Sequence, residues 1–174
     1  RRGHDVVVVA SRLEPGLATV SDDVDGVRLL QLPDLAPVRL RNGGLSPIDL
    51  LGRLRLVRKL DADVVHAFEP RPTATLPALA LRRRTGARYV ADWADLWGAQ
   101  GMAATWPLLE RTTLGRLDDA LQRRTRATAD AVTAISASLA THARELGVPD
   151  DRVRLVTIGA NADTFHPGEA RAAR

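Results

Sequence analysis

Two aspartates and two tryptophans stand close together in residues 92–101, which have the sequence DWADLWGAQG. Asp92 and Asp95 lie three residues apart, and Trp93 and Trp97 are interleaved with them. A carboxylate accepts hydrogen bonds from hydroxyl groups, while an indole face covers apolar C–H surface. This combination is suited to holding a sugar, and it makes Asp92, Trp93 and Asp95 binding candidates. The alternative is that both aspartates cap a short following helix and that the tryptophans pack in the core.

Two further loops follow predicted strands and carry polar groups. Glu69 follows a strand predicted at Asp63–Ala67, and the loop Gly159–Asp163 follows a strand predicted at Val153–Ile158. In open α/β sheets, ligands bind at the edge that is formed by the carboxyl ends of the strands. The binding candidates added from these loops are Glu69, Gly159 and Asn161.

Each of these loop residues also has a purely structural interpretation. Glu69 would be an ordinary exposed acid. Gly159 and Asn161 would serve a tight turn with positive φ, which both residue types tolerate. His66, three residues before Glu69, is predicted to be a buried strand residue that hydrogen-bonds to backbone, and not a catalyst.

Composition bounds the class of protein. The chain of 174 residues, with 45% hydrophobic and 26% charged residues, is long enough for one well-buried domain but not for two. It has no cysteine, which excludes disulfides and thiolate zinc sites. Its four histidines form no i, i+4 pair, so we expect no metal site. No apolar run approaches the roughly 20 residues of a membrane span.

The charge balance is basic, with a formal net charge of +4, and Lys59 is the only lysine. Codon bias in a GC-rich genome would explain this preference for arginine. The alternative is attraction to anionic lipid headgroups or to nucleic acid. Aromatic residues make up only 3% of the chain and leave few stacking platforms, which argues against nucleic acid.

Strands and helices alternate along the chain, which favours a parallel sheet covered by helices on both faces. Apolar runs predict strands at Val6–Ala10, Val27–Leu32, Asp63–Ala67, Arg88–Ala91, Ala131–Ile135 and Val153–Ile158. Capping residues and helical periodicity predict helices after Ser46, over Thr73–Arg84, over Trp106–Arg126 and between Ser136 and Gly147. In the first of these helices, the predicted apolar face consists of Ile48, Leu51, Leu54 and Val57. Gly16–Gly26 and Pro33–Gly44 are predicted to be loops.

The most specific pattern is Ala129–Pro167, which predicts a strand, a capped helix, a second strand and a turn. It resembles the end of the N-terminal domain of family 4 glycosyltransferases, whose pattern is ADAVIAVS…LRELGVP…RV.V.PNGVD…F.P. Two shorter segments support this resemblance. Asp63–Pro70 (DVVHAFEP) is similar to the family's DIVHAHDP, and Val90–Trp97 is similar to its VYDxHDLW.

The resemblance implies an α/β fold, namely the Rossmann-like, acceptor-side domain of a retaining GT-B glycosyltransferase. Such an enzyme transfers a sugar from a nucleoside-diphosphate sugar to a hydroxyl group of a sugar, lipid or small-molecule acceptor. It implies no cofactor and no bound metal, because helix N-termini and basic groups neutralise the diphosphate. It also implies a cytoplasmic protein without a nucleic-acid partner, and peripheral contact with the inner membrane face is a further expectation.

The motifs also depart from the family pattern. Asp92 and Asp95 occupy matching positions and are the catalytic candidates, but Ala94 replaces a histidine that in many members lies near the reacting sugar. Phe68 replaces a second histidine, and Glu69 stands for an aspartate. Retaining transfer does not require a protein base at Ala94, because the departing phosphate oxygen can accept the proton of the acceptor.

The resemblance further implies a fragment. Residues 1–168 would be the acceptor-side domain, and residues 169–174 would begin a linker to a donor-binding domain. The opening RRGHDVVV matches the end of the family's first helix and the start of its second strand. A first strand between Val6–Ala10 and Asp63–Ala67 would then be missing, so we expect an interruption of the sheet there. We also expect the isolated chain to be inactive.

Two rival functions remain open. One is a non-catalytic α/β binding module, which Ala94 favours, and the other is a different α/β enzyme such as a sugar-nucleotide epimerase. No G-x-G-x-x-G or P-loop pattern follows a predicted strand, which argues against dinucleotide and ATP binding. A glycine pair after a preceding strand would support the transferase, whereas G-x-x-G-x-x-G would support the epimerase.

Overall fold

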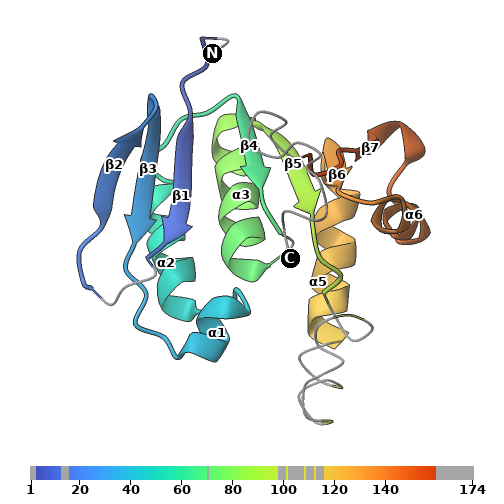
Figure 1. The fold of residues 1–174 in the computed structure, drawn as a ribbon, viewed down its shortest axis with the longest axis horizontal. Coiled ribbons are helices and arrows are strands. Elements are labelled where there is room, and N and C mark those ends of the chain that lie inside the picture. Colours follow the sequence, from blue (N-terminus) through green and yellow to red (C-terminus); the bar gives the residue numbers. More distant parts are fainter. Residues whose placement is uncertain are drawn as a thin grey trace, which may run out of the picture.

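The computed structural model describes residues 3–12, 16–69, 71–97, 101, 108, 112 and 116–159. Within these residues the strands form two sheets (Figure 1). The first sheet has the order β1-β3-β2 and consists of β1 (Val7–Ser11), β2 (Val20–Val24) and β3 (Val27–Leu32). The second has the order β4-β5-β6-β7 and consists of β4 (Val64–Ala67), β5 (Arg88–Trp93), β6 (Ala131–Ala134) and β7 (Val153–Leu155). All four strands of the second sheet are parallel.

The described helices are α1 (Val38–Asn42), α2 (Pro47–Leu56), α3 (Pro72–Thr85), α5 (Arg116–Ala127), α6 (Ala137–Glu145) and a 3₁₀ turn at Asp150–Arg152. In Figure 1, α2, α3 and α5 lie behind the strands. α6 packs against β6 and β7. The molecule is therefore an α/β domain with a parallel sheet flanked by helices. None of the described helices is long and apolar enough to cross a bilayer.

Local signals in the sequence explain where several helices begin and end. The side chain of Ser46 accepts a hydrogen bond from the Asp49 amide at the start of α2, and Ser136 caps α6 in the same way. Gly86 and Gly147 follow α3 and α6 with φ of 77° and 89°. This left-handed conformation is cheap for glycine, so these four positions were predictable.

The prediction that Gly16–Gly26 is a loop is wrong. The segment contains β2, which pairs with β3 as an antiparallel hairpin. Asp25 and Gly26 form its turn with φ of 56° and 76°, and two positive φ values are typical of the tight turn that fits strand twist. The loop predicted at Pro33–Gly44 likewise contains the short helix α1.

The predicted apolar face of α2 is also wrong in part. Ile48 and Leu51 are 45% and 53% exposed, whereas Asp49 is only 3% exposed. Asp49 turns inward because it accepts hydrogen bonds from the Ser11 hydroxyl at the end of β1 and from Arg53 of its own helix. A buried carboxylate with two partners therefore sets the rotation of this helix.

The main core lies in the second sheet and is rich in alanine. Tyr89, Ala91 and Trp93 alternate along β5 and point into it, together with Val132 and Ala134 of β6. Small side chains let α3 and α6 approach the sheet closely.

The expected interruption of the sheet is confirmed. β1 and β4 belong to different sheets and share no hydrogen-bonded ladder in the described chain. The packing of α2 against α3 joins the two halves instead. Of the helix predicted over Trp106–Arg126, the structure describes α5 from Arg116 onward, together with the single residues Leu108 and Thr112, which are also helical. The rest of the segment 106–115 lies outside the described residues.

Candidate functional site

The predicted polar residues meet at the carboxyl edge of β4 and β5. β4 ends at Ala67 and is followed by Glu69, while β5 ends at Trp93 and is followed by Asp95 and Trp97. The two strands are adjacent and parallel, so the loops after them lie at the same edge. This edge is the position at which open α/β sheets bind ligands.

Glu69 is the best-defined member of the site. The Trp97 indole N–H donates a hydrogen bond to Glu69 Oε2 at 2.7 Å, which ties the two loops together. The Glu69 backbone has φ of 64°, a left-handed conformation that is uncommon for residues other than glycine. The surrounding structure therefore holds this carboxylate in a strained and defined position, as functional residues often are.

Asp92 lies one strand away and is held from the opposite side. Its cross-strand neighbour in the register is Thr133 of β6, whose hydroxyl donates a hydrogen bond to Asp92 Oδ1. His66 of β4 places its Nε2 atom 3.9 Å from the same oxygen. The His66 ring stacks on Phe68, with 4.3 Å between the ring centroids. His66 is thus half-exposed at the site and not a buried strand residue, so that prediction is wrong.

The surroundings of the site raise the pKa of Glu69 and lower the pKa of His66. Burial raises the pKa of Glu69, and the carboxylates of Asp95 and Asp92 raise it further, whereas the Trp97 hydrogen bond and Arg126 lower it. Burial lowers the pKa of His66, against the opposing effect of Asp92. Asp95 and Asp92 are therefore close enough to Glu69 to influence its titration, and the site combines carboxylates with an imidazole.

Arg71 supports Trp97 from below. Its guanidinium carbon lies 4.2 Å from the centroid of the Trp97 ring, and its Nε–H donates to the Gly43 carbonyl. Gly44 next to that carbonyl has φ of 61°, and a Cβ atom there would overlap the Arg71 side chain. The close backbone approach at Gly44 thus fixes Arg71, which in turn positions Trp97 and the carboxylate of Glu69.

Trp93 does not face the site. Its side chain is 0% exposed, with the Arg126 guanidinium 3.0 Å above its ring and His142 5.2 Å away. This is a correction to the expectation that Trp93 covers a sugar, because an indole with no exposed surface has none to offer a ligand. The core interpretation holds for Trp93, whereas Trp97 is the indole at the edge.

Gly159 is exposed and has no heavy atom within 4 Å of where a Cβ would lie. Its φ lies outside the left-handed region, so the tight-turn explanation is not needed there. Asn161, together with Asp163, lies outside the described residues. The structure therefore brings together Glu69, Asp92 and Asp95, and leaves Gly159 apart.

The residues that support the carboxylates, Thr133 and Arg71, are not among the site residues predicted from the sequence. Thr133 could have been found from the strand register, because it lies opposite Asp92 in the neighbouring strand. Arg71 had only one signal, its position directly after a predicted strand exit. Within the described part of the chain, no group of three or more histidine, aspartate and glutamate side chains could hold a metal ion.

The fold and the candidate site define a Rossmann-like α/β domain with several carboxylates at one edge of its parallel sheet. The model of the family described as glycosyl transferase 4-like domain matches residues 1–159. The chain therefore belongs to this family of glycosyltransferases. A comparison with curated proteins gave no match.

Proposed function

We propose that the protein is a retaining GT-B glycosyltransferase, and that residues 1–168 are its acceptor-side domain. It would transfer a sugar from a nucleoside-diphosphate sugar to the hydroxyl group of a sugar, lipid or small-molecule acceptor. The family match supports the transferase class. The proposal adds the stereochemistry, the type of donor, the domain role and a cytoplasmic location.

A single observation carries the proposal for the acceptor side. Glu69 and Asp92 approach the same edge from adjacent parallel strands, and each is fixed by a hydrogen bond from another element. Fixed carboxyl groups at a sheet edge are suited to orienting hydroxyl groups, because their oxygens accept hydrogen bonds from hydroxyl donors.

Asp92, Glu69 and Asp95 would have different roles in binding the acceptor, because their surroundings differ. Asp92, held by Thr133, would accept a hydrogen bond from the acceptor hydroxyl, and Glu69 would orient a neighbouring hydroxyl. Asp95 is exposed at the same loop and would extend the binding surface. Gly159 and Asn161 would contribute to a separate part of the substrate site. The departing phosphate oxygen would accept the acceptor proton, so no protein base is needed.

The donor diphosphate would be held mainly by a second domain, as the resemblance implies. We therefore expect residues 1–174 alone to bind no nucleotide sugar tightly and to transfer none. Titration of this chain with a panel of nucleotide sugars tests the expectation. Micromolar affinity for any of them would overturn the domain assignment.

The first testable prediction concerns the carboxylates. In the intact enzyme, Glu69→Gln and Asp92→Asn should each reduce turnover roughly a hundredfold, because each replaces one positioned carboxyl oxygen by an NH₂ donor and removes the negative charge. The measurement is release of nucleoside diphosphate with a hydroxyl acceptor present. Asp63→Asn is the control, because Asp63 is exposed at the opposite end of β4 and should leave turnover unchanged.

The same experiment separates transferase from binding module. A binding module would hold sugar ligands without releasing nucleoside diphosphate, and both substitutions would then weaken binding alone. If turnover and melting temperature fall in parallel in both variants, the carboxylates have a structural role and the proposed site is wrong.

A further inference from the structure

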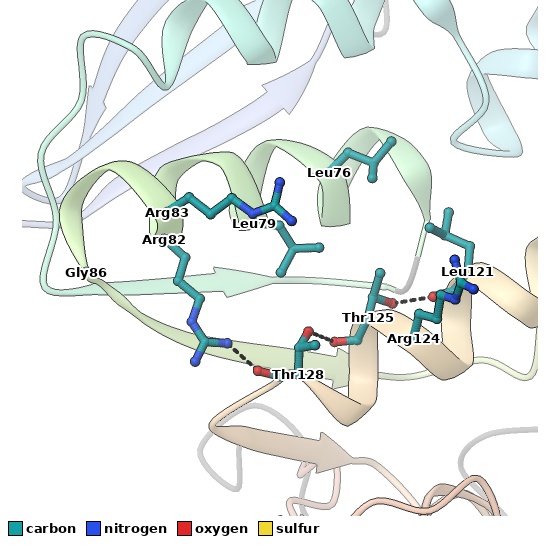
Figure 2. Close-up of a pocket in the computed structure, with 9 residues that line it drawn as sticks. All are labelled: Leu76, Leu79, Arg82, Arg83, Gly86, Leu121, Arg124, Thr125 and Thr128. Carbon is teal, nitrogen blue, oxygen red and sulfur yellow. Dashed lines mark hydrogen bonds between the residues drawn. The ribbon is translucent and has the colours of Figure 1, made fainter.

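A groove lies between α3 and α5, away from the carboxylate site (Figure 2). Its volume is about 710 Å³, within the range of about 300–1,000 Å³ that is typical of small-molecule sites. One end is formed by Gly86 and Thr128, which shortly precede β5 and β6. The groove therefore opens toward the amino edge of the sheet, opposite to the edge that carries Glu69 and Asp92.

The lining combines an apolar floor with arginine walls. Leu76, Leu79 and Leu121 contribute the floor and are half-buried, so a ligand must enter the groove to reach them. The walls carry Arg82 and Arg83 on α3 and Arg124 on α5. In Figure 2, the side chain of Arg83 runs along α3 toward Leu79.

Two of these three arginines carry a positive charge that no ion pair neutralises within the described residues. Arg82 is engaged, because it donates to the Thr128 carbonyl and forms an ion pair with Asp130 at 3.1 Å. Arg83 and Arg124 are exposed and have no ion pair within the described residues. The groove therefore presents two unneutralised positive charges, one on each wall.

The other polar groups of the described lining limit the kinds of ligand that the groove could bind. The hydroxyls of Thr125 and Thr128 are already donated to carbonyls within the same chain segment. Among the described residues that line the groove there is no carboxylate, so a sugar, which needs acceptors as well as donors, fits poorly. These described lining residues include no aromatic side chain either, and aromatic side chains are the usual platform for a nucleotide base.

We propose that this groove binds a single-chain anionic amphiphile, with its phosphate or carboxylate head between Arg83 and Arg124 and its hydrocarbon tail along the leucine floor. The charge of the walls matches the head, and the recessed apolar floor matches the tail. Because the leucines are recessed, the occupant is a monomeric amphiphile that enters the groove and not a flat bilayer surface. This site is separate from the proposed transfer site and does not depend on it.

The test uses dodecyl phosphate below the concentration at which it forms micelles, titrated into the protein by calorimetry. We expect saturable binding, at least tenfold tighter than that of inorganic phosphate or of dodecyl maltoside, because head and tail each contribute. Affinity should increase from octyl to decyl to dodecyl phosphate, since each methylene removed completely from water contributes up to about fourfold.

Matched variants locate the site. Arg83→Gln with Arg124→Gln should weaken binding of dodecyl phosphate at least tenfold, and Leu79→Asn should remove the dependence on chain length. The control, Arg58→Gln with Arg123→Gln, changes the net charge equally at two exposed arginines outside the groove and should alter binding by less than twofold.

Three results would overturn the proposal. One is equal loss of binding in the control pair, which would indicate general attraction of anions. Another is binding to vesicles of acidic phospholipid without binding of monomeric dodecyl phosphate, which would indicate a membrane surface. The third is binding of an acidic amphipathic helical peptide in the absence of amphiphile binding, which would indicate a protein partner.

Discussion

Glu69 shows how one residue of the site depends on its neighbours. Its left-handed backbone costs roughly 1–3 kcal/mol for a residue other than glycine, so the structure around it must compensate for this strain. The hydrogen bond from Trp97 and the stacking of Trp97 on Arg71 supply part of that compensation. The position of the Glu69 carboxylate therefore depends on three side chains from two loops, those of Glu69, Arg71 and Trp97.

The raised pKa of Glu69 predicts a pH dependence of stability. Because the pKa is higher in the folded than in the unfolded state, folding favours the protonated form, and stability is lost as pH rises above the ordinary value of 4.5. The Glu69→Gln variant does not lose stability in this way, because its side-chain amide does not titrate. The free energy of unfolding of the variant, relative to the unsubstituted protein, should therefore increase between pH 4 and pH 7 in urea titrations. An unchanged difference between the two pH values would show that the carboxyl group of Glu69 titrates normally.

Gly44 is a second position at which a single residue matters. An added Cβ atom would overlap the Arg71 side chain, and φ of 61° is unfavourable for alanine. Gly44→Ala should therefore lower the free energy of unfolding by about 2–4 kcal/mol. The control is Gly52→Ala inside α2, where the nearest atom is 3.6 Å away. Alanine should stabilise that helix by about 0.5–1 kcal/mol, and equal effects at both sites would contradict the steric account.

At the scale of elements, the sequence predicts what depends on local chemistry. The strands β3 and β4 and the caps at Ser46 and Ser136 follow from apolar runs and from side-chain hydrogen bonds to nearby amides. β2 was missed because its residues Ser21, Asp22 and Asp23 are polar, although the following Asp-Gly pair signals a hairpin.

The rotation of α2 could not be predicted in the same way. It depends on hydrogen bonds between Asp49, Arg53 and Ser11, and Ser11 lies 38 residues before Asp49 in the sequence. The contact of Trp97 with Glu69 is equally non-local. Periodicity reports the average apolar face of a helix, whereas these contacts between distant segments decide which side chains turn inward.

The two serine caps offer a prediction about elements. Both accept a hydrogen bond from a helix amide, but Ser46 is buried and also donates to Asp34 Oδ1 at 2.7 Å. Asp34 is itself buried, and its Oδ2 atom has no hydrogen-bond partner in the described chain. Ser136→Ala should cost about 1 kcal/mol, the usual value for a cap.

Ser46→Ala should cost about 1–3 kcal/mol more, because it also deprives a buried carboxylate of a donor. Chemical denaturation of both variants measures the difference. Equal losses would mean that the contact between Ser46 and Asp34 contributes nothing beyond the cap.

At the scale of the whole molecule, the most unusual feature is the pair of facing halves without a common sheet. β1 and β4 point in the same direction in Figure 1, and within the described part of the chain each has a strand partner on one side only. Val6 just before β1, Val8 in β1 and Val64 in β4 are exposed despite their β-branched, apolar side chains. Arg53 compensates in part, because it donates a hydrogen bond to the Val9 carbonyl at 3.2 Å.

The hydrogen bonds between strands show which backbone amides of β1 and β4 have no partner within the two described sheets. The Val6 carbonyl and the Arg12 amide bond to β3, so the even-numbered residues of β1 face that strand and Val7 and Val9 face away. In β4 the Asp63 carbonyl bonds to the Arg88 amide of β5, so Val64 and His66 face away.

Hydrogen exchange on the 174-residue chain should therefore alternate along both strands. The amides of Val7, Val9, Val64 and His66 should exchange at least roughly a hundredfold faster than those of Val8, Ala10, Val65 and Ala67, because only the second set is bonded within a sheet. Exchange followed by NMR at single residues measures this. Fast exchange of every amide would mean frayed strands, and slow exchange of every amide would mean that β1 and β4 pair with each other or with another strand. Only alternation fits two separate sheets whose edge strands β1 and β4 each bond to a neighbour on one side.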